Sequence, residues 1–192
     1  DTNLTVIRSL FADNHSSGNA GAIFNYAGHA SLSNCTLSGN SASFGGALNN
    51  SATFGSKPAA TATLDHCTLS GNTAALSGQI LNQNDAQLTL IGTIVAGEYN
   101  CSGNAPPIDG GANFSSDGSC NGAAILTGFD AILRANGGPT LTHALLAGSN
   151  AINAGSACSL ATDARGIARD GHCDSGSYEL TDAIFRNGFE AP

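Results

Sequence analysis

The chain has 192 residues, a formal net charge of −8 and only 10% charged residues, and it contains neither Trp nor Met. The negative charge argues against nucleic-acid binding, because contacts with phosphates require a basic patch. No run of about 18 apolar residues is present, so no membrane span is expected. Ala, Gly, Ser, Thr and Asn take the place of larger side chains, which favours a thin solenoid over a globule with a wide core.

One pattern occurs four times in the first half of the chain. Residues 61–72 and 31–40 are nearly identical, residues 4–14 are a looser copy, and residues 88–97 are a fourth. A second pattern follows the first three copies, in residues 21–25, 46–50 and 78–82. The repeat length is 26 residues from Asn14 to Asn40 and 32 residues from Asn40 to Asn72. Periods of roughly 20–50 residues indicate a solenoid, a propeller or an array.

Short strands are predicted within each repeat. Apolar and polar residues alternate, which is typical of strands, and Gly, Asn and Ser separate the segments as turn residues do. The sequence therefore predicts an all-β fold, a single-stranded parallel β-helix, with a loop around residues 55–58 in the longest repeat. The repeated core positions are Val6, Ser9 and Phe11; Leu32, Cys35 and Leu37; Leu64, Cys67 and Leu69; and Leu88, Leu90 and Ile94.

Equivalent residues of successive coils are expected to lie about 4.8 Å apart, like over like. Leu32 would then lie between Val6 and Leu64. Two ladders of stacked amides are predicted at corners, where they would satisfy backbone groups that are otherwise buried without partners. The predicted ladders are Asn14, Asn40 and Asn72, and Asn25, Asn50 and Asn82.

Cys35 and Cys67 occupy equivalent positions in two repeats and are expected to stack. They could form a disulfide between adjacent coils. They could equally remain a pair of buried thiols, since Cys packs well as a small apolar residue. Both alternatives remain open at the level of sequence.

The repeats carry a family resemblance. The units SGN…GGALNN and SGN…GQILN resemble the GGA[IL]-x-N repeats of polymorphic outer-membrane-protein-like β-helix proteins. This resemblance implies a right-handed coil.

The repeat pattern ends after Gly97, and an irregular cap is expected to follow. A bond between Cys101 and Cys120 would close a loop of about 20 residues, which the chain-entropy model values at roughly 3 kcal/mol. Cys158 and Cys173 are the next natural pair. Six Cys without paired CxxC motifs favour disulfides over zinc, and hence an oxidising, extracellular setting. The predicted organisation is residues 1–97 as coils, 98–180 as a disulfide-stapled C-terminal cap and 181–192 as a tail.

Three ordered motifs in this second half carry a further resemblance. Residues 136–155, 162–166 and 173–179 together resemble the choice-of-anchor Q group of bacterial secreted and surface proteins. The resemblance implies an extracellular β-helix protein at a cell surface, with no enzymatic activity defined for the group. Residues 183–192 are similar to the IFxDGFE tails of secreted proteins from some gammaproteobacteria, with Asn187 where Asp is usual.

Parallel β-helices often degrade polysaccharides, so a polysaccharide-active enzyme is one alternative. Such chemistry needs clustered carboxylates and a cation near an acidic sugar. The acids of the repeat region are scattered along the chain: Asp1, Asp13, Asp65 and Asp85. Only two cationic side chains precede Arg134, and these are Arg8 and Lys57. The pattern favours a protein that is not an enzyme, with a polysaccharide lyase or glycosidase as a remaining alternative.

The triplet Asp65-His66-Cys67 suggests a nucleophile with an adjacent base. Strand alternation, however, predicts that His66 and Cys67 point to different faces, which favours a core Cys beside an exposed His. Asp163, Arg165, Asp174 and Glu179 could form a structural calcium site or a salt bridge, and the salt bridge is favoured. No other cofactor is expected. The remaining histidines are interpreted as surface or structural residues: His15, His29, His143 and His172.

The amino-terminal coil begins by Leu4 with no segment predicted to cover it. Unpaired strand edges invite another strand, so we expect either preceding coils of a longer precursor or a second molecule docked head-to-tail. The side chains expected at this contact are Leu4, Val6, Phe11 and Ile23, with Ile184, Phe185 and Phe189 of the tail.

The sequence-based hypothesis is an extracellular structural β-solenoid, a fibre-forming or adhesive protein that is secreted or held at a bacterial cell surface. The alternatives are a module that binds glycans or a host surface, and the polysaccharide-active enzyme described above.

Overall fold

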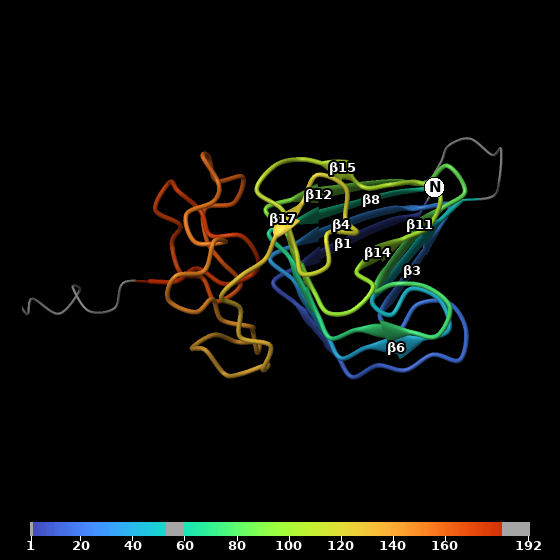
Figure 1. The fold of residues 1–192 in the computed structure, drawn as a ribbon, viewed down its shortest axis with the longest axis horizontal. Coiled ribbons are helices and arrows are strands. Elements are labelled where there is room, and N and C mark those ends of the chain that lie inside the picture. The colour runs from blue at the N-terminus through green and yellow to red at the C-terminus, as the bar shows by residue number, and fades with distance from the viewer. Residues whose placement is uncertain (1, 53–59, 182–192) are drawn as a thin grey trace, which may run out of the picture.

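The computed structural model describes residues 2–52 and 60–181, which contain β-strands and no helix. Four sheets are present (Figure 1). Sheet A contains β1 (Asn3–Ile7), β4 (His29–Ser33), β8 (Thr61–Asp65), β12 (Gln87–Ile91) and β15 (Ile108–Asp109). Sheet B contains β2 (Leu10–Ala12), β5 (Thr36–Ser38), β9 (Thr68–Ser70), β13 (Ile94–Ala96), β16 (Phe114–Ser115) and β17 (Ala124–Ile125). Sheet C contains β3 (Ile23–Tyr26), β7 (Leu48–Ser51), β11 (Ile80–Gln83) and β14 (Cys101–Ser102), and sheet D contains β6 (Ser41–Ala42) and β10 (Thr73–Ala74).

Every strand pair is parallel and joins equivalent positions of successive repeats. Val6 pairs with Leu32, Leu32 with Leu64, and Leu64 with Leu90. The predicted all-β fold with like residues stacked on like is therefore confirmed. This register follows from the alternating pattern, because a slip of one residue would move every apolar side chain to the outer face.

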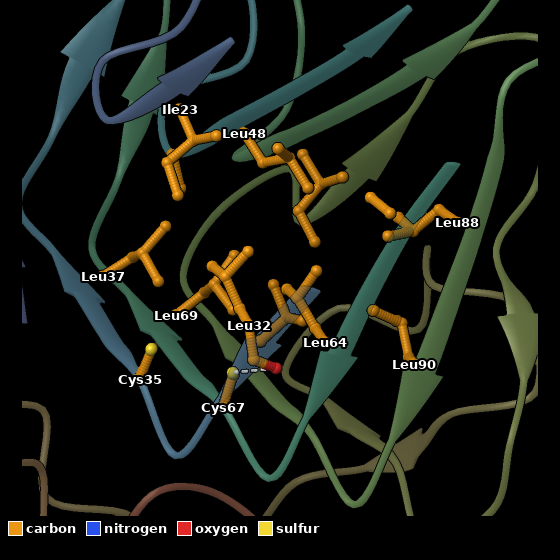
Figure 2. Close-up of a cluster of buried hydrophobic side chains, with 14 of the residues drawn as sticks. Ile23, Leu32, Cys35, Leu37, Leu48, Leu64, Cys67, Leu69, Leu88 and Leu90 are labelled. Atoms are coloured by element: carbon orange, nitrogen blue, oxygen red, sulfur yellow. Dashed lines mark hydrogen bonds between the residues drawn. The ribbon is translucent and has the colours of Figure 1, made fainter. Parts of the chain in front are cut away.

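The apolar side chains of sheets A, B and C point into one shared interior (Figure 2). Leu32, Leu37, Leu64 and Leu69 are completely buried there. Cys35 and Cys67 lie in the same interior as free thiols, which decides between the two alternatives left open by the sequence. The thiol of Cys67 contacts the carbonyl oxygen of Leu32 at 3.5 Å (Figure 2).

The stacked strands extend beyond the boundary predicted at Gly97. Ile80 pairs with Cys101 and Ile94 with Phe114, and Phe114 then pairs with Ala124 in β17. The disulfide between Cys101 and Cys120 joins two segments within these last repeats, and its Cα atoms are 5.0 Å apart. The sequence did not reveal these pairings because the strands are only two residues long and lack the repeated motif.

Residues 126–181 do not cover the end of the stack, as the predicted cap would. They lie beside it (orange to red in Figure 1) and pack against the outer face of sheet B. Ile94 and Phe114 of sheet B form a second apolar cluster with Leu145 and Ala151 of this segment, which we call the C-terminal segment. Its own disulfide joins Cys158 to Cys173.

Several predicted features fall outside the described residues. These are the loop around residues 55–58, the side chains of Asp1 and Lys57, and the tail with Ile184, Phe185 and Phe189. Within the described ranges, no helix is long and apolar enough to cross a membrane.

Candidate functional site

The corner between sheets A and B carries residues that contact a distant part of the chain. Arg8, Asn34, His66 and Gly92 occupy the same place in four successive repeats, one residue after the strands of sheet A. All four have positive φ angles, between 46° and 53°. This left-handed conformation turns the side chains of Arg8, Asn34 and His66 away from the interior, and Gly and Asn adopt it at least cost. We call this group the corner column.

The C-terminal segment is attached along the corner column. Asn34 Nδ2 donates to the carbonyl oxygen of Thr162 at 2.7 Å, and Asn34 Oδ1 accepts from Arg169 Nη2 at 3.1 Å. Two repeats further on, the backbone N–H of Gly176 donates to the carbonyl of Gly92. The column therefore holds residues of the C-terminal segment that are far from it in the sequence, 128 and 135 residues away in the contacts of Asn34.

His66 is buried, so its predicted exposure was wrong. Its Nδ1 lies 2.7 Å from Asp65 Oδ1, and the hydroxyl of Ser159 donates to the same carboxylate oxygen at 2.7 Å. Burial alone would raise the pKa of Asp65, but hydrogen bonds from His66 and Ser159 outweigh it and leave the pKa below its usual value. Cys67 belongs to the interior cluster, as predicted, and His66 does not. His66 is buried because Asp65, Ser159 and Gly92 lie against its ring.

These three side chains do not have the geometry of a catalytic triad. In a triad, the hydroxyl and the carboxylate contact opposite nitrogens of the imidazole. Here Ser159 Oγ lies 3.2 Å from Nδ1, the nitrogen that also contacts Asp65. The other edge of the ring lies against Gly92, where a Cβ atom would approach Nε2 to 2.8 Å. The arrangement is suited to anchoring residue 159 at the corner.

The acidic side chains of the repeats are also far from a paired-carboxylate arrangement. Asp65 lies in register between Ser33 and Ile91. Asp13 follows β2, and Asp85 lies in the turn between β11 and β12. The structure therefore does not bring these acids together as glycosidase chemistry requires.

A buried ionic network lies within the C-terminal segment. Arg169 Nη1 donates to Glu179 Oε2 at 2.6 Å, and Arg165 Nη2 is 2.7 Å from Asp163 Oδ2. The guanidinium of Arg165 also donates to the carbonyl of Glu179 and lies 3.8 Å from the centre of the Tyr178 ring. The sequence left a structural calcium site and a salt bridge as alternatives for these residues, and the structure contains the salt bridges. Across residues 2–52 and 60–181, no three His, Cys, Asp or Glu side chains form a group that could hold a metal ion.

Burial and the neighbouring carboxylate of Asp174 raise the pKa of Glu179 from its usual 4.5 to about 7, although Arg169 opposes this. The folded state then binds this proton more tightly than the unfolded chain. We expect the contribution of Glu179 to stability to be fully present below about pH 4.5 and to be lost as the pH rises towards 7. Thermal unfolding between pH 5 and 8, compared with Glu179→Gln, measures it.

The comparison with Glu179→Gln is needed because other groups titrate in this range. Burial lowers the pKa of His143, so acidification below about 6.5 acts in the opposite direction. Burial raises the pKa of Asp174, which acts in the same direction as Glu179. The variant keeps both of these groups. An identical pH dependence in the wild type and the variant would contradict the assignment to Glu179.

Hydroxyl groups on the outer face of sheet B also bind the C-terminal segment. Thr36 Oγ1 and Ser177 Oγ are 2.8 Å apart, and the N–H of Ser177 donates to Thr68 Oγ1 at 2.9 Å. His143 Nε2 lies 3.0 Å from Ser38 Oγ. His143 was predicted to be a surface or structural residue, and the structure buries it. Its local sequence does not indicate the contact with Ser38, which is 105 residues away.

The asparagines of the repeats form hydrogen-bonded ladders. Asn14 Nδ2 donates to Asn40 Oδ1 at 2.8 Å, and Asn40 Nδ2 donates to Asn72 Oδ1 at 2.8 Å. The same ladder continues through Gln79 and Asn100, which sequence analysis did not include. Asn100 then donates to the carboxylate of Asp117, an acceptor that ends the ladder.

The second ladder runs through sheet C. Asn25 Nδ2 donates to Asn50 Oδ1, and Asn50 Nδ2 donates to Asn82 Oδ1, both at 2.7 Å. Asn82 donates in turn to backbone carbonyls of Ala86 and Ala105. Both ladders are buried except at the outermost member Asn14, so they tie successive repeats together inside the fold.

The residues expected at an assembly contact have different exposures. Leu4 is 43% exposed, and Val6 and Phe11 are half-buried. Ile23 is 6% exposed because its side chain belongs to the interior cluster, so its assignment to an exposed contact was wrong. Phe24, the next residue of β3, faces outward and is 46% exposed.

Two exposed side chains were missed by sequence analysis. Leu76 and Tyr99 are 70% and 77% exposed, the highest values among the large hydrophobic residues of the described chain. The signal for their exposure was their position in turns rather than in the alternating strands.

No protein-family model, curated protein sequence or solved structure matches the chain.

Proposed function

We propose that the chain is a right-handed parallel β-helix that acts as an extracellular structural element, extended by strand addition at its amino-terminal edge. The parallel stacked sheets and the two disulfides are compatible with this proposal. Disulfides persist in oxidising compartments, which supports a secreted or cell-surface location. The resemblance to the choice-of-anchor Q group points to the same location.

The observation that carries the proposal is that an inward-facing side chain of the outermost strand β1 is much more exposed than its equivalents in the later repeats. Leu4 of β1 occupies an inward position, in register with Ala30, Ala62 and Leu88. The exposed fraction is 43% at Leu4 and at most 5% at the other three positions. The apolar interior is thus open at this edge, where β1 and β2 are the outermost strands of their sheets.

The occupant that we propose for this edge is a second copy of the chain. The opposite edge of the stack also has outermost strands, β15, β17 and β14, and carries Ile108 and Ile125 at 50% and 55% exposure. A contact between two different edges is heterologous and can continue into a filament. Asp117 ends the amide ladder near that edge, so the contact would be made by apolar side chains and backbone groups.

The expected result is a molar mass that rises with protein concentration, measured by light scattering after size exclusion, with filaments visible by electron microscopy. Leu4→Lys should keep the chain monomeric, because it places a charge on the open edge. Leu146→Lys is the matched control, since Leu146 is 48% exposed in the C-terminal segment. A wild-type chain that stays monomeric at millimolar concentration would overturn self-assembly, as would equal effects of the two variants.

A further inference from the structure

Leu76 and Tyr99, the two most exposed large hydrophobic residues described, line the same groove. The groove has a volume of about 480 Å³ and is lined by residues of β10 and β14 and of the turns next to them. Such a volume is in the range of small-ligand sites, roughly 300–1,000 Å³. Two adjacent apolar side chains are too few for a protein interface of standard size but enough to cover one face of a small ring.

The backbone holds Tyr99 rigidly. Its φ angle is 51°, which is uncommon for a residue with a bulky side chain. The carbonyl of Tyr99 accepts from the N–H of Gln79 at 2.7 Å, and the next residue, Asn100, is fixed by hydrogen bonds to Ser115 and Asp117. An exposed aromatic residue on such a fixed support loses little conformational entropy when it binds a ligand.

The hydroxyl groups of Ser102 and Ser119, which line the groove, already donate hydrogen bonds within the protein. Ser102 Oγ donates to the carbonyl of Ile80, and Ser119 Oγ donates to Asp117 Oδ1. Each of these oxygens also accepts one backbone N–H, from Gly78 and Cys101. A hydroxyl oxygen has two lone pairs, so one acceptor position remains on each. The groove therefore offers acceptors to a ligand rich in O–H donors.

The charge of the groove excludes acidic ligands. None of the described residues that line it is cationic, and Asp117 accepts a hydrogen bond from the hydroxyl of Ser119. Over the whole chain the formal charge is −8. Carboxylates, sulfates and phosphates would therefore enter without a counter-charge, which is costly.

We propose that this groove binds an uncharged pyranose unit of a polysaccharide. The apolar C–H face of the sugar lies against Tyr99 and Leu76, and its hydroxyls donate to Ser102 and Ser119. The site goes beyond the structural role proposed above. Because Cys101 and Ser102 of the outermost strand β14 line the groove, sugar binding and self-association are measured separately.

The test is titration with neutral oligosaccharides of glucose, mannose, xylose and N-acetylglucosamine, with an oligogalacturonate as the acidic comparison. The chain has three Tyr and no Trp, so tyrosine fluorescence and NMR shifts of residues around the groove report binding. At least one neutral oligosaccharide should bind, and the acidic one should not. Tyr99→Ala should weaken binding about tenfold or more, because the stacking surface is lost.

The variants separate the site from general effects on folding. Tyr99→Asn also removes the ring, and Asn tolerates the left-handed backbone, so it should bind as weakly as Tyr99→Ala. Tyr99→Phe should retain binding, and the control Leu146→Ala should behave as wild type. Absence of binding to every neutral oligosaccharide, stronger binding of the acidic one, or unchanged binding in both ring-deletion variants would overturn the proposal. Self-association that Tyr99→Asn abolishes would also overturn it, in favour of a protein contact.

Discussion

Replacement of Asn72 by Ala is expected to lower the free energy of unfolding by about 3–5 kcal/mol, because several buried groups lose their partners. Asn72 Oδ1 accepts from both the backbone N–H and the Nδ2 of Asn40. Its own Nδ2 donates to the carbonyl of Leu37 and to Gln79 Oε1. Asn72 is 1% exposed, so water cannot replace these bonds without opening the fold. Chemical denaturation with circular dichroism measures the loss.

The matched control for this prediction is the outermost member of the same ladder. Asn14 is exposed, and its side chain contributes one donated bond, to Asn40 Oδ1. The same oxygen still accepts from the backbone N–H of Asn14 after substitution. Asn14→Ala should therefore cost about 1 kcal/mol or less. Equal losses in the two variants would show that the ladder does not stabilise the repeats as a buried network.

Arg169→Met is expected to lower the free energy of unfolding of the C-terminal segment by about 3–5 kcal/mol, because it leaves a buried carboxylate without its cation. The Arg169 side chain is completely buried. It donates to Glu179 Oε2, to the carbonyls of Asp174 and Gly176, and to Asn34 Oδ1 in the corner column. Hydrogen exchange should show reduced protection in residues 142–180, with smaller changes in β8, β9, β12 and β13.

Two further variants test the physical cause. Arg169→Met combined with Glu179→Gln should recover part of the loss, because the unpaired charge is removed. Arg134→Met breaks a comparable pair with Asp130, but Arg134 is 55% exposed. This exposed pair should contribute far less to stability than the buried pair, because solvent screens its charges. The prediction fails if the buried and exposed pairs have the same effect, or if the double variant is less stable than Arg169→Met.

The repeated half of the chain could be predicted in detail. Successive repeats have nearly the same residues, so Leu32 and Leu64 face the same environment and stack in register. The amides of Asn40 and Asn72 must follow the same register, because they lie at equivalent positions of the repeat. The last strands were missed, since two-residue strands such as β14 and β17 have too few positions for an alternating pattern. In the fourth repeat, Val95 and not the predicted Ile94 belongs to the interior cluster, where it pairs with Leu69.

The candidate site could not be predicted in the same way. The corner column contains Arg8, Asn34, His66 and Gly92, four different residue types whose common feature is a left-handed backbone. Their partners Ser159 and Arg169 come from a segment without repeats, and the Asn34–Arg169 contact spans 135 residues. A local pattern carries no information about such pairs.

The sequence alone determined that strands of successive repeats stack in parallel, because each repeat presents the same apolar and amide positions to the next. Only the tertiary structure decided where residues 126–181 lie, that His66 is buried, and that Leu76 and Tyr99 meet in one groove. These features depend on contacts between unlike segments, whose free energies are set by packing and by burial of charge in three dimensions.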